Sequence, residues 1–321
     1  ITECIALLRS VAKSRDRENV VISLSVRITG IVLVISAMII AQGMGNPLSF
    51  NEIPYQASGL LILAAGLRLG VLPPIQLNLK EPNRFINIEK TIRFISSAAG
   101  MIIGIRAANF GVMDDWFLII IVLSTTVVIL NGIFWIHAKN DINGLSYWIL
   151  GYGSFSLVAA AQGFQSASLA WALAMMFSGA ILFYFSQSNR WLIMLVYLGG
   201  IGISTLPLTP SWEGGVQLYS LPWFIRIIFL VIQALMIVGY IRISMQSKDK
   251  KQGMEKWGFL VYSVGLMILP IIHYGLFYFM WISGYIHVSF RAPGWWSGLI
   301  SASLAAIILI RYRDKIILPH T

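Results

Sequence analysis

The sequence predicts an all-α polytopic membrane protein with about ten transmembrane helices, and three features of the chain support this fold class. Hydrophobic residues make up 57% of the 321 residues and charged residues only 11%, whereas a soluble domain carries about 25% charged residues. Apolar stretches of about 20 residues, the length that crosses a bilayer, follow one another along most of the chain. Tryptophans stand at the start of several stretches, at the headgroup level where indoles gather.

Ten apolar stretches form the candidate spans. They lie near residues 20–42, 56–78, 90–110, 116–138, 146–165, 168–186, 190–207, 218–243, 257–283 and 294–311. Residues 1–19 form a charged cytoplasmic lead-in, which we expect to be the remnant of a longer chain because residue 1 is Ile rather than Met. Residues 20–244 form the main membrane domain, 245–256 a cytoplasmic linker, and 257–321 two C-terminal spans with a tail.

The charges in the connections between spans predict the sidedness of the chain. If the first span starts in the cytoplasm, the inner connections and the tail hold Lys80, Arg84, Lys90, Lys139, Arg190, Lys248, Lys250, Lys251, Lys256, Arg311, Arg313 and Lys315. The outer connections hold Glu52, Asp114, Asp115, Glu213 and Arg291. Ten spans with both ends cytoplasmic therefore satisfy the positive-inside rule with one exception. We expect an integral protein of a bacterial plasma membrane, with the lipid bilayer as its first partner.

The composition excludes several other classes of protein. The net charge of +10 comes from basic residues scattered between apolar runs, so they form no basic face for nucleic acid. The single cysteine, Cys4, excludes a disulfide framework, a four-cysteine zinc site and an iron–sulfur cluster within the chain. A haem needs paired axial histidines on facing helices, and the one histidine that stands well inside a span, His273, does not supply such a pair. We therefore expect no cofactor, no metal and no catalytic centre in this chain.

Prolines and glycines interrupt two candidate spans, 56–78 and 190–207. The positions concerned are Pro73 and Pro74 in the first, and Gly199, Gly200, Gly202, Pro207 and Pro210 in the second. A proline inside a helix removes a hydrogen bond and clashes with the preceding turn. The two spans stand five apart, so they run in opposite directions. Matched broken helices in inverted halves are typical of transporter sites, although glycine and proline are also ordinary in membrane helices.

Few charged or titratable side chains fall within the spans, and five residues are candidates for an ion pathway: Arg68, His137, Asp141, Tyr147 and His273. Arg68 stands deepest, five residues before the first proline break. It either lines a polar cavity, where it can hold an anion, or caps carbonyls that the break frees. His273 is the titratable candidate inside a span, with a hydrogen-bonded structural histidine as the alternative.

The order of these features resembles the antiporter-like membrane subunits of respiratory complex I and of the related cation/proton antiporter complexes. In that family a broken helix carries a lysine five residues before a proline, and here Arg68 precedes Pro73 by five. The next family span ends in an arginine, as this one does at Arg106. Two spans later, HAKNDINGLSYWILGYGSFS matches the family's aspartate and tyrosine-serine run with Asp141 and Tyr147.

Two later segments extend the resemblance to about residues 20–240. SGAILFYF follows the pattern of a helix end that carries a lysine in the family, and TLPLTPSW resembles the family's second broken helix. The resemblance implies a membrane subunit that translocates protons within a larger assembly, such as an NADH:quinone oxidoreductase-type complex. Other membrane subunits of that assembly would be its partners.

The chain departs from the family at the relay positions. Arg68, Ala98 and Gly179 stand where the family has lysines, Met175 stands where a histidine is frequent, and the family's essential glutamate would lie before residue 1. Because arginine stays protonated, it does not readily relay a proton. The resemblance therefore implies a divergent C-terminal portion whose role is structural or whose coupling is altered.

Two other functions compete with this interpretation. A stand-alone secondary transporter of a small solute would use Arg68 as its binding charge. A membrane transferase would need paired acids that hold magnesium at the interface. The only adjacent acids near a span, Asp114 and Asp115, would point about 100° apart on a helix. The subunit hypothesis therefore ranks first.

Overall fold

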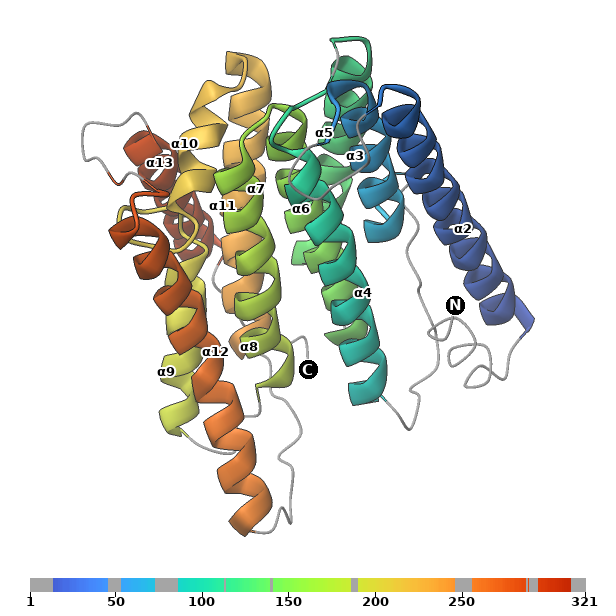
Figure 1. The fold of residues 1–321 in the computed structure, drawn as a ribbon. Coiled ribbons are helices and arrows are strands. Elements are labelled where there is room, and N and C mark those ends of the chain that lie inside the picture. Colours follow the sequence, from blue (N-terminus) through green and yellow to red (C-terminus); the bar gives the residue numbers. More distant parts are fainter. Residues whose placement is uncertain are drawn as a thin grey trace. The chain divides into compact units, whose positions relative to one another are not determined.

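The computed structural model describes residues 14–45, 53–72, 86–112, 114–138, 141–185, 190–245, 256–286, 288 and 294–312. These residues form helices joined by turns, and no strand occurs among them (Figure 1). The predicted all-α fold class is therefore confirmed for the described part of the chain. The chain divides into two compact units. The first unit contains Ile1–Leu130 and Leu145–Ala172, and the second contains Asn131–Gly144 and Leu173–Thr321.

The first unit is built mainly around one short helix that packs between two long ones. Its helices are α2 (Ser14–Gly43), α3 (Tyr55–Leu69), α4 (Ile86–Ala107), and most of α5 (Asp114–Ile136), α6 (Asp141–Ala161) and α7 (Gln165–Leu173). α3 packs against both α2 and α4. Glycines allow this close approach: a Cβ added at Gly104 would lie 3.5 Å from the Cβ of Ala65. Most of α3 is buried as a result.

The second unit contains several interruptions of regular helix. Its elements after Ala172 are the π-helix η1 (Ala174–Ser178), α8 (Gly179–Tyr184), α9 (Arg190–Gly202), α10 (Trp212–Ser220), α11 (Trp223–Met245), α12 (Lys256–Ile282) and α13 (Gly294–Arg311). The fully buried indole of Trp135 lies against Gly239 of α11 and donates to the carbonyl of Met236 at 3.0 Å. This contact fixes the C-terminal end of α5 to α11.

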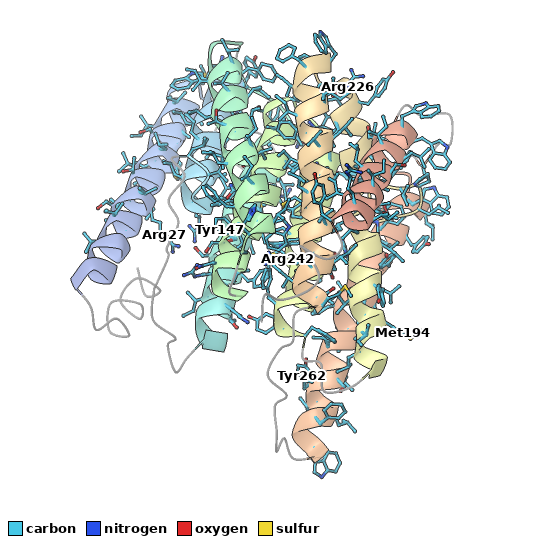
Figure 2. The ribbon with its side chains drawn as sticks, turned by 180° about the vertical axis from the view of Figure 1, so that it is seen from behind. Arg27, Tyr147, Met194, Arg226, Arg242 and Tyr262 are labelled. Atoms are coloured by element: carbon cyan, nitrogen blue, oxygen red, sulfur yellow. The ribbon has the colours of Figure 1, made fainter. Side chains whose placement is uncertain are left out.

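Six of the described helices are long and apolar enough to cross a membrane. They are Leu24–Gly43, Trp116–Ile136, Gln165–Tyr184, Trp223–Met245, Trp257–Ile282 and Gly294–Arg311. Large apolar side chains are exposed along them, including Ile39 and Phe279. Figure 2 shows Met194 of α9 also pointing outward. These helices make the chain an integral membrane protein, while the count of ten spans, the inverted repeat and the sidedness stay predictions.

The first predicted break begins earlier than the prolines suggested. α3 ends at Leu69 because Gly70 adopts a left-handed conformation, with a φ of 74°, and its N–H turns back to the carbonyls of Gly66 and Leu67. Glycine is the residue that adopts this conformation without strain. Pro73 and Pro74 lie outside the described residues. The helix therefore ends through its glycine cap, before either proline is reached.

Candidate functional site

The second interrupted span contains a non-helical segment between α9 and α10. α9 ends at Gly202, α10 begins at Trp212, and residues 203–211 between them are not helical. Pro207 and Pro210 lie within this segment. Thr205 and Leu208 have positive φ values of 55° and 66°, a conformation that costs about 1–3 kcal/mol and concentrates at functional sites. We refer to residues 203–211 as the α9–α10 break.

Gly199 and Gly200 do not interrupt α9, contrary to the sequence analysis. Both are helical and face α11, where the ring of Tyr240 occupies the room that a side chain would need. The Tyr240 hydroxyl donates to the carbonyl of Val196 at 3.1 Å. These glycines therefore serve the close packing of α9 against α11, and the interruption begins only after Gly202.

A histidine and a serine from two other elements face the end of α9. A Cβ added at Gly202 would lie 3.4 Å from His273 Nδ1 and 3.4 Å from Ser178 Oγ. Both side chains are fully buried, and neither imidazole nitrogen nor the hydroxyl has a hydrogen-bond partner among the described residues. Phe177 stacks on the imidazole at a centroid distance of 5.5 Å. Gly202 therefore leaves a polar space beside the α9–α10 break.

Gln233 connects α11 to the same region. Its Nε2 donates to the carbonyl of Ile203 at 2.5 Å, the first residue after α9. Its Oε1 is buried and accepts no hydrogen bond from any described group. The hydroxyl of Thr205 is in the same situation, while the Thr205 N–H is bound by Ser211 Oγ at 3.0 Å. The break is thus surrounded by polar atoms from several helices.

We call Ser178, Gln233 and His273, with the adjacent backbone of Gly202 and Ile203, the break cluster. A buried polar atom left without a hydrogen bond costs about 1–3 kcal/mol, so such atoms mark places that bind water or a small polar ligand. Ser178 is also the last residue of the π-helix η1. Single π-turns inside membrane and soluble helices are frequent at functional sites. The cluster is therefore a group of buried polar side chains beside the α9–α10 break.

The candidate His137 and the nearby Arg242 contact carbonyls at the end of α5. His137 follows α5 and is exposed, with its Nδ1 2.8 Å from the carbonyl of Ile133 in the last turn. Arg242 of α11 donates to the carbonyls of Ile136 and Ala138. Both groups therefore lie against carbonyls at the negative end of the helix dipole of α5.

Asp141 and Tyr147, the two further candidates, lie on α6. Asp141 is the first residue of α6, and its side chain lies outside the described part of the structure. Tyr147 is half-buried on the same helix, within the first unit (Figure 2). Further along α6, Ser154 donates to the carbonyl of Leu150 and Ser156 to that of Ser168. The bond of Ser154 is local to α6, whereas the bond of Ser156 connects α6 to α7.

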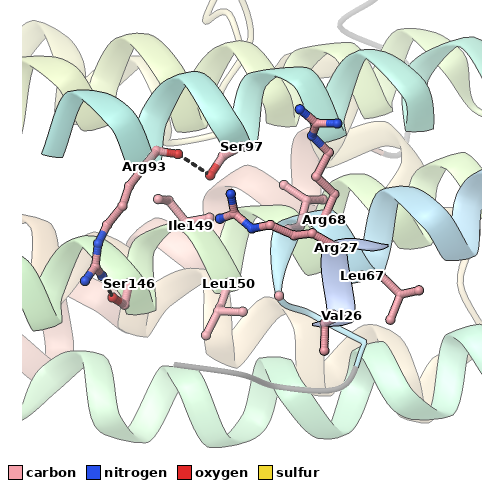
Figure 3. A pocket seen from close by; sticks show the side chains of 11 residues that line it. Val26, Arg27, Leu67, Arg68, Arg93, Ser97, Ser146, Ile149 and Leu150 are labelled. Carbon is pink, nitrogen blue, oxygen red and sulfur yellow. Dashed lines mark hydrogen bonds between the residues drawn. The ribbon is translucent and has the colours of Figure 1, made fainter. Parts of the chain in front are cut away.

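Arg68 lies at the end of α3 and lines a cavity of about 70 Å³ in the first unit. Figure 3 shows it with Arg27 of α2 and Arg93 of α4, next to Ser97 and Ser146. Arg93 is buried and donates to Ser146 Oγ at 2.5 Å. Arg68 is exposed and stands one residue before its helix ends. Arg68 is therefore a helix-terminal charge that lines a cavity, and its depth in the membrane stays a prediction.

The described residues contain no candidate metal-binding site. No three His, Cys, Asp or Glu side chains come together there in a way that could hold an ion. The polar groups of the break cluster are neutral hydroxyl, amide and imidazole groups, which suit water and protons. The sequence did not identify Ser178 or Gln233. A single glutamine inside the apolar helix α11 was an available signal, whereas the π-turn at Ser178 has no sequence signature.

Comparison with known proteins identifies the fold. No family model matches the chain, and no curated protein does. Among solved structures, the chain is similar to a chain in the structure of the Mrp complex from Dietzia sp. DQ12-45-1b, with a TM-score of 0.67 and 12% sequence identity. The match covers 99% of this chain and 43% of that chain. The protein therefore shares the fold of the matched part of that chain and spans less than half of that chain's length.

Proposed function

We propose that the protein is an antiporter-like membrane subunit of a multi-subunit assembly, and that the break cluster forms part of a proton pathway through its second unit. The fold shared with a chain of the Mrp complex supports the first part. The observation that carries the second part is the α9–α10 break, where His273 and Ser178 face Gly202 in a buried space.

The chemistry of the cluster suits proton transfer through water. A neutral imidazole accepts a proton at one nitrogen and donates from the other, and histidines inside membrane segments mark proton paths. Ser178 and Gln233 offer buried oxygen atoms beside the α9–α10 break that can order water. At the three positions where the resemblance predicts relay lysines, this chain instead has Arg68, Ala98 and Gly179. A pathway in this chain therefore depends on the histidine at the break rather than on lysines.

The assembly is tested first by purification. The protein would be extracted from native membranes in mild detergent with a C-terminal tag, and co-purifying chains would be identified by mass spectrometry. We expect other membrane subunits in stoichiometric amounts. Recovery as a single chain or a homo-oligomer would contradict the subunit proposal and would favour a stand-alone transporter.

The pathway is tested on the purified assembly in liposomes with a pH-sensitive dye inside. We expect His273→Ala to lower proton flux by about 100-fold, the lower range for a group that transfers protons. Tyr262→Phe is the matched control, since it removes one hydrogen bond of α12, to the carbonyl of Tyr184, about 16 Å along the helix from His273. Equal flux in wild type and His273→Ala would exclude the histidine from the pathway.

A further inference from the structure

Three arginines of the first unit, Arg27, Arg68 and Arg93, line one cavity, and two glycines bring their helices together. A Cβ added at Gly30 would lie 3.7 Å from the Cβ of Leu67, and one at Gly100 would lie 3.4 Å from the Cβ of Arg68. α2 and α4 can therefore approach α3 closely near its C-terminal end. The arginines come from all three helices, so the cluster depends on the tertiary fold.

The lining of the cavity is basic and polar at one side and apolar at the other. Besides Arg27, Arg68 and Arg93 it is formed by Val26, Leu67, Leu69, Gly70, Ser97, Ser146, Ile149 and Leu150. None of these lining residues, all of which the structure describes, is acidic. Guanidinium groups that share a cavity repel one another, and the repulsion grows as water is excluded. An anion inside the cavity would relieve that repulsion.

Arg27 and Arg68 each lie close to the end of an apolar helical segment. Arg27 is the fourth residue of the apolar segment Leu24–Gly43, about 5 Å from its start at the helical rise per residue. Arg68 is the last residue but one of α3. Arginine side chains near the end of an apolar segment can extend their charged ends towards the membrane interface. A ligand with phosphate at the membrane surface could therefore reach them.

We propose that this cavity binds a phosphate group, carried either by an anionic lipid or by free inorganic phosphate. A guanidinium is planar and donates two parallel hydrogen bonds, which match the oxygens of a phosphate. Arg68 places an exposed guanidinium at the opening of the cavity, and it makes no hydrogen bond or ion pair within the described residues. Arg93, held by Ser146, provides a buried charge at the inner wall. The site does not depend on proton translocation.

The test uses the whole purified protein and two probes. Nanodiscs of phosphatidylglycerol mixed with phosphatidylcholine are compared with nanodiscs of phosphatidylcholine alone, and native mass spectrometry counts the phosphatidylglycerol molecules that remain bound. Inorganic phosphate is titrated separately in detergent by calorimetry. Retention of phosphatidylglycerol identifies the lipid as the source, and saturable heat with phosphate identifies the free anion. If neither probe binds, the proposal is wrong.

Variants of two exposed arginines in the first unit assign the binding to the cavity. We expect Arg68→Gln to weaken binding by about tenfold or more, the effect of losing one charge-assisted contact, and Arg68→Lys to weaken it less. Arg106→Gln is the control, since Arg106 is exposed in the last turn of α4 and does not line the cavity. Equal effects of Arg68→Gln and Arg106→Gln would overturn the proposal and leave only general attraction to positive charge.

Discussion

Single glycines decide which helices can touch in this protein. Gly239 lets the indole of Trp135 lie directly on α11, and Gly202 leaves the space that His273 and Ser178 share. The same residue type does nothing of this kind at Gly265 of α12, where an added Cβ meets no atom within 4 Å. The effect of replacing a glycine should therefore differ widely between these positions.

Gly239→Ala should destabilise the protein by about 1–3 kcal/mol, because a methyl group there overlaps the buried Trp135 ring and overpacking costs that amount. Gly265→Ala should be neutral or stabilise by up to about 1 kcal/mol, since alanine favours the helix and nothing is in the way. Thermal unfolding of the two variants in the same detergent measures the difference. Equal melting temperatures would contradict the contact between α5 and α11.

Gly202→Ala separates function from stability. Its methyl group would lie 3.4 Å from Nδ1 and Cε1 of His273 and from Ser178 Oγ, an ordinary contact distance that the fold tolerates. The methyl group would nevertheless occupy the polar space between them. We expect an unchanged melting temperature and a proton flux lowered by about tenfold or more. Gly200→Ala, whose methyl would lie 3.4 Å from the Tyr240 ring, should leave the flux unchanged.

The positions of the helices could be predicted from the sequence, but their interruptions and contacts could not be fully predicted. Hydropathy located the helices because a membrane-crossing helix must be apolar over its whole length. Pro207 and Pro210 correctly indicated the α9–α10 break. The prediction that Gly199 and Gly200 also interrupt the helix was wrong, because these two glycines make room for the ring of Tyr240. Similarly, the end of α3 depends on Gly70, a cap that the neighbouring Pro73 and Pro74 obscured.

The break cluster could be predicted only in part, for a physical reason. His273 was a candidate because a titratable group inside an apolar stretch stands out in the sequence. Its neighbours Ser178 and Gln233 come from different helices, far apart along the chain. Their proximity depends on helix packing and on the π-turn that ends at Ser178. Periodicity alone does not indicate either of these.

The link between α11 and the end of α9 can be tested through Gln233. Gln233→Leu removes the donor to the Ile203 carbonyl and leaves that group buried without it, so we expect a loss of about 1–3 kcal/mol together with lower proton flux. Ser244→Ala on the same helix removes a hydrogen bond to Ile241, three residues away, and should change stability by less than about 0.5 kcal/mol. Chemical denaturation in mixed micelles compares the two variants.

At the scale of the whole molecule, the order of the spans determines on which side of the membrane each connection lies. The alternation predicted from charge places the end of α4 outside and the end of α5 inside. Five further predicted spans, ending with α12, return the chain to the outside, and α13 brings it back. The helices α4, α5, α12 and α13 end close to residues with exposed side chains, which are Phe110, His137, Ser283 and Tyr312.

Single cysteines at these four positions test the count directly, in a background where Cys4 is replaced by serine. A membrane-impermeant maleimide added to intact cells should label Phe110→Cys and Ser283→Cys, whereas inverted vesicles should expose His137→Cys and Tyr312→Cys. The reagent cannot cross the hydrocarbon core, so each result gives one side. If Phe110→Cys and His137→Cys are labelled as predicted but Ser283→Cys and Tyr312→Cys are labelled from the opposite sides, one of the five predicted spans between His137 and Ser283 does not cross. The short helix α9, which has only 13 residues and ends at the break, would be the first candidate, because about 20 residues are needed to span the core.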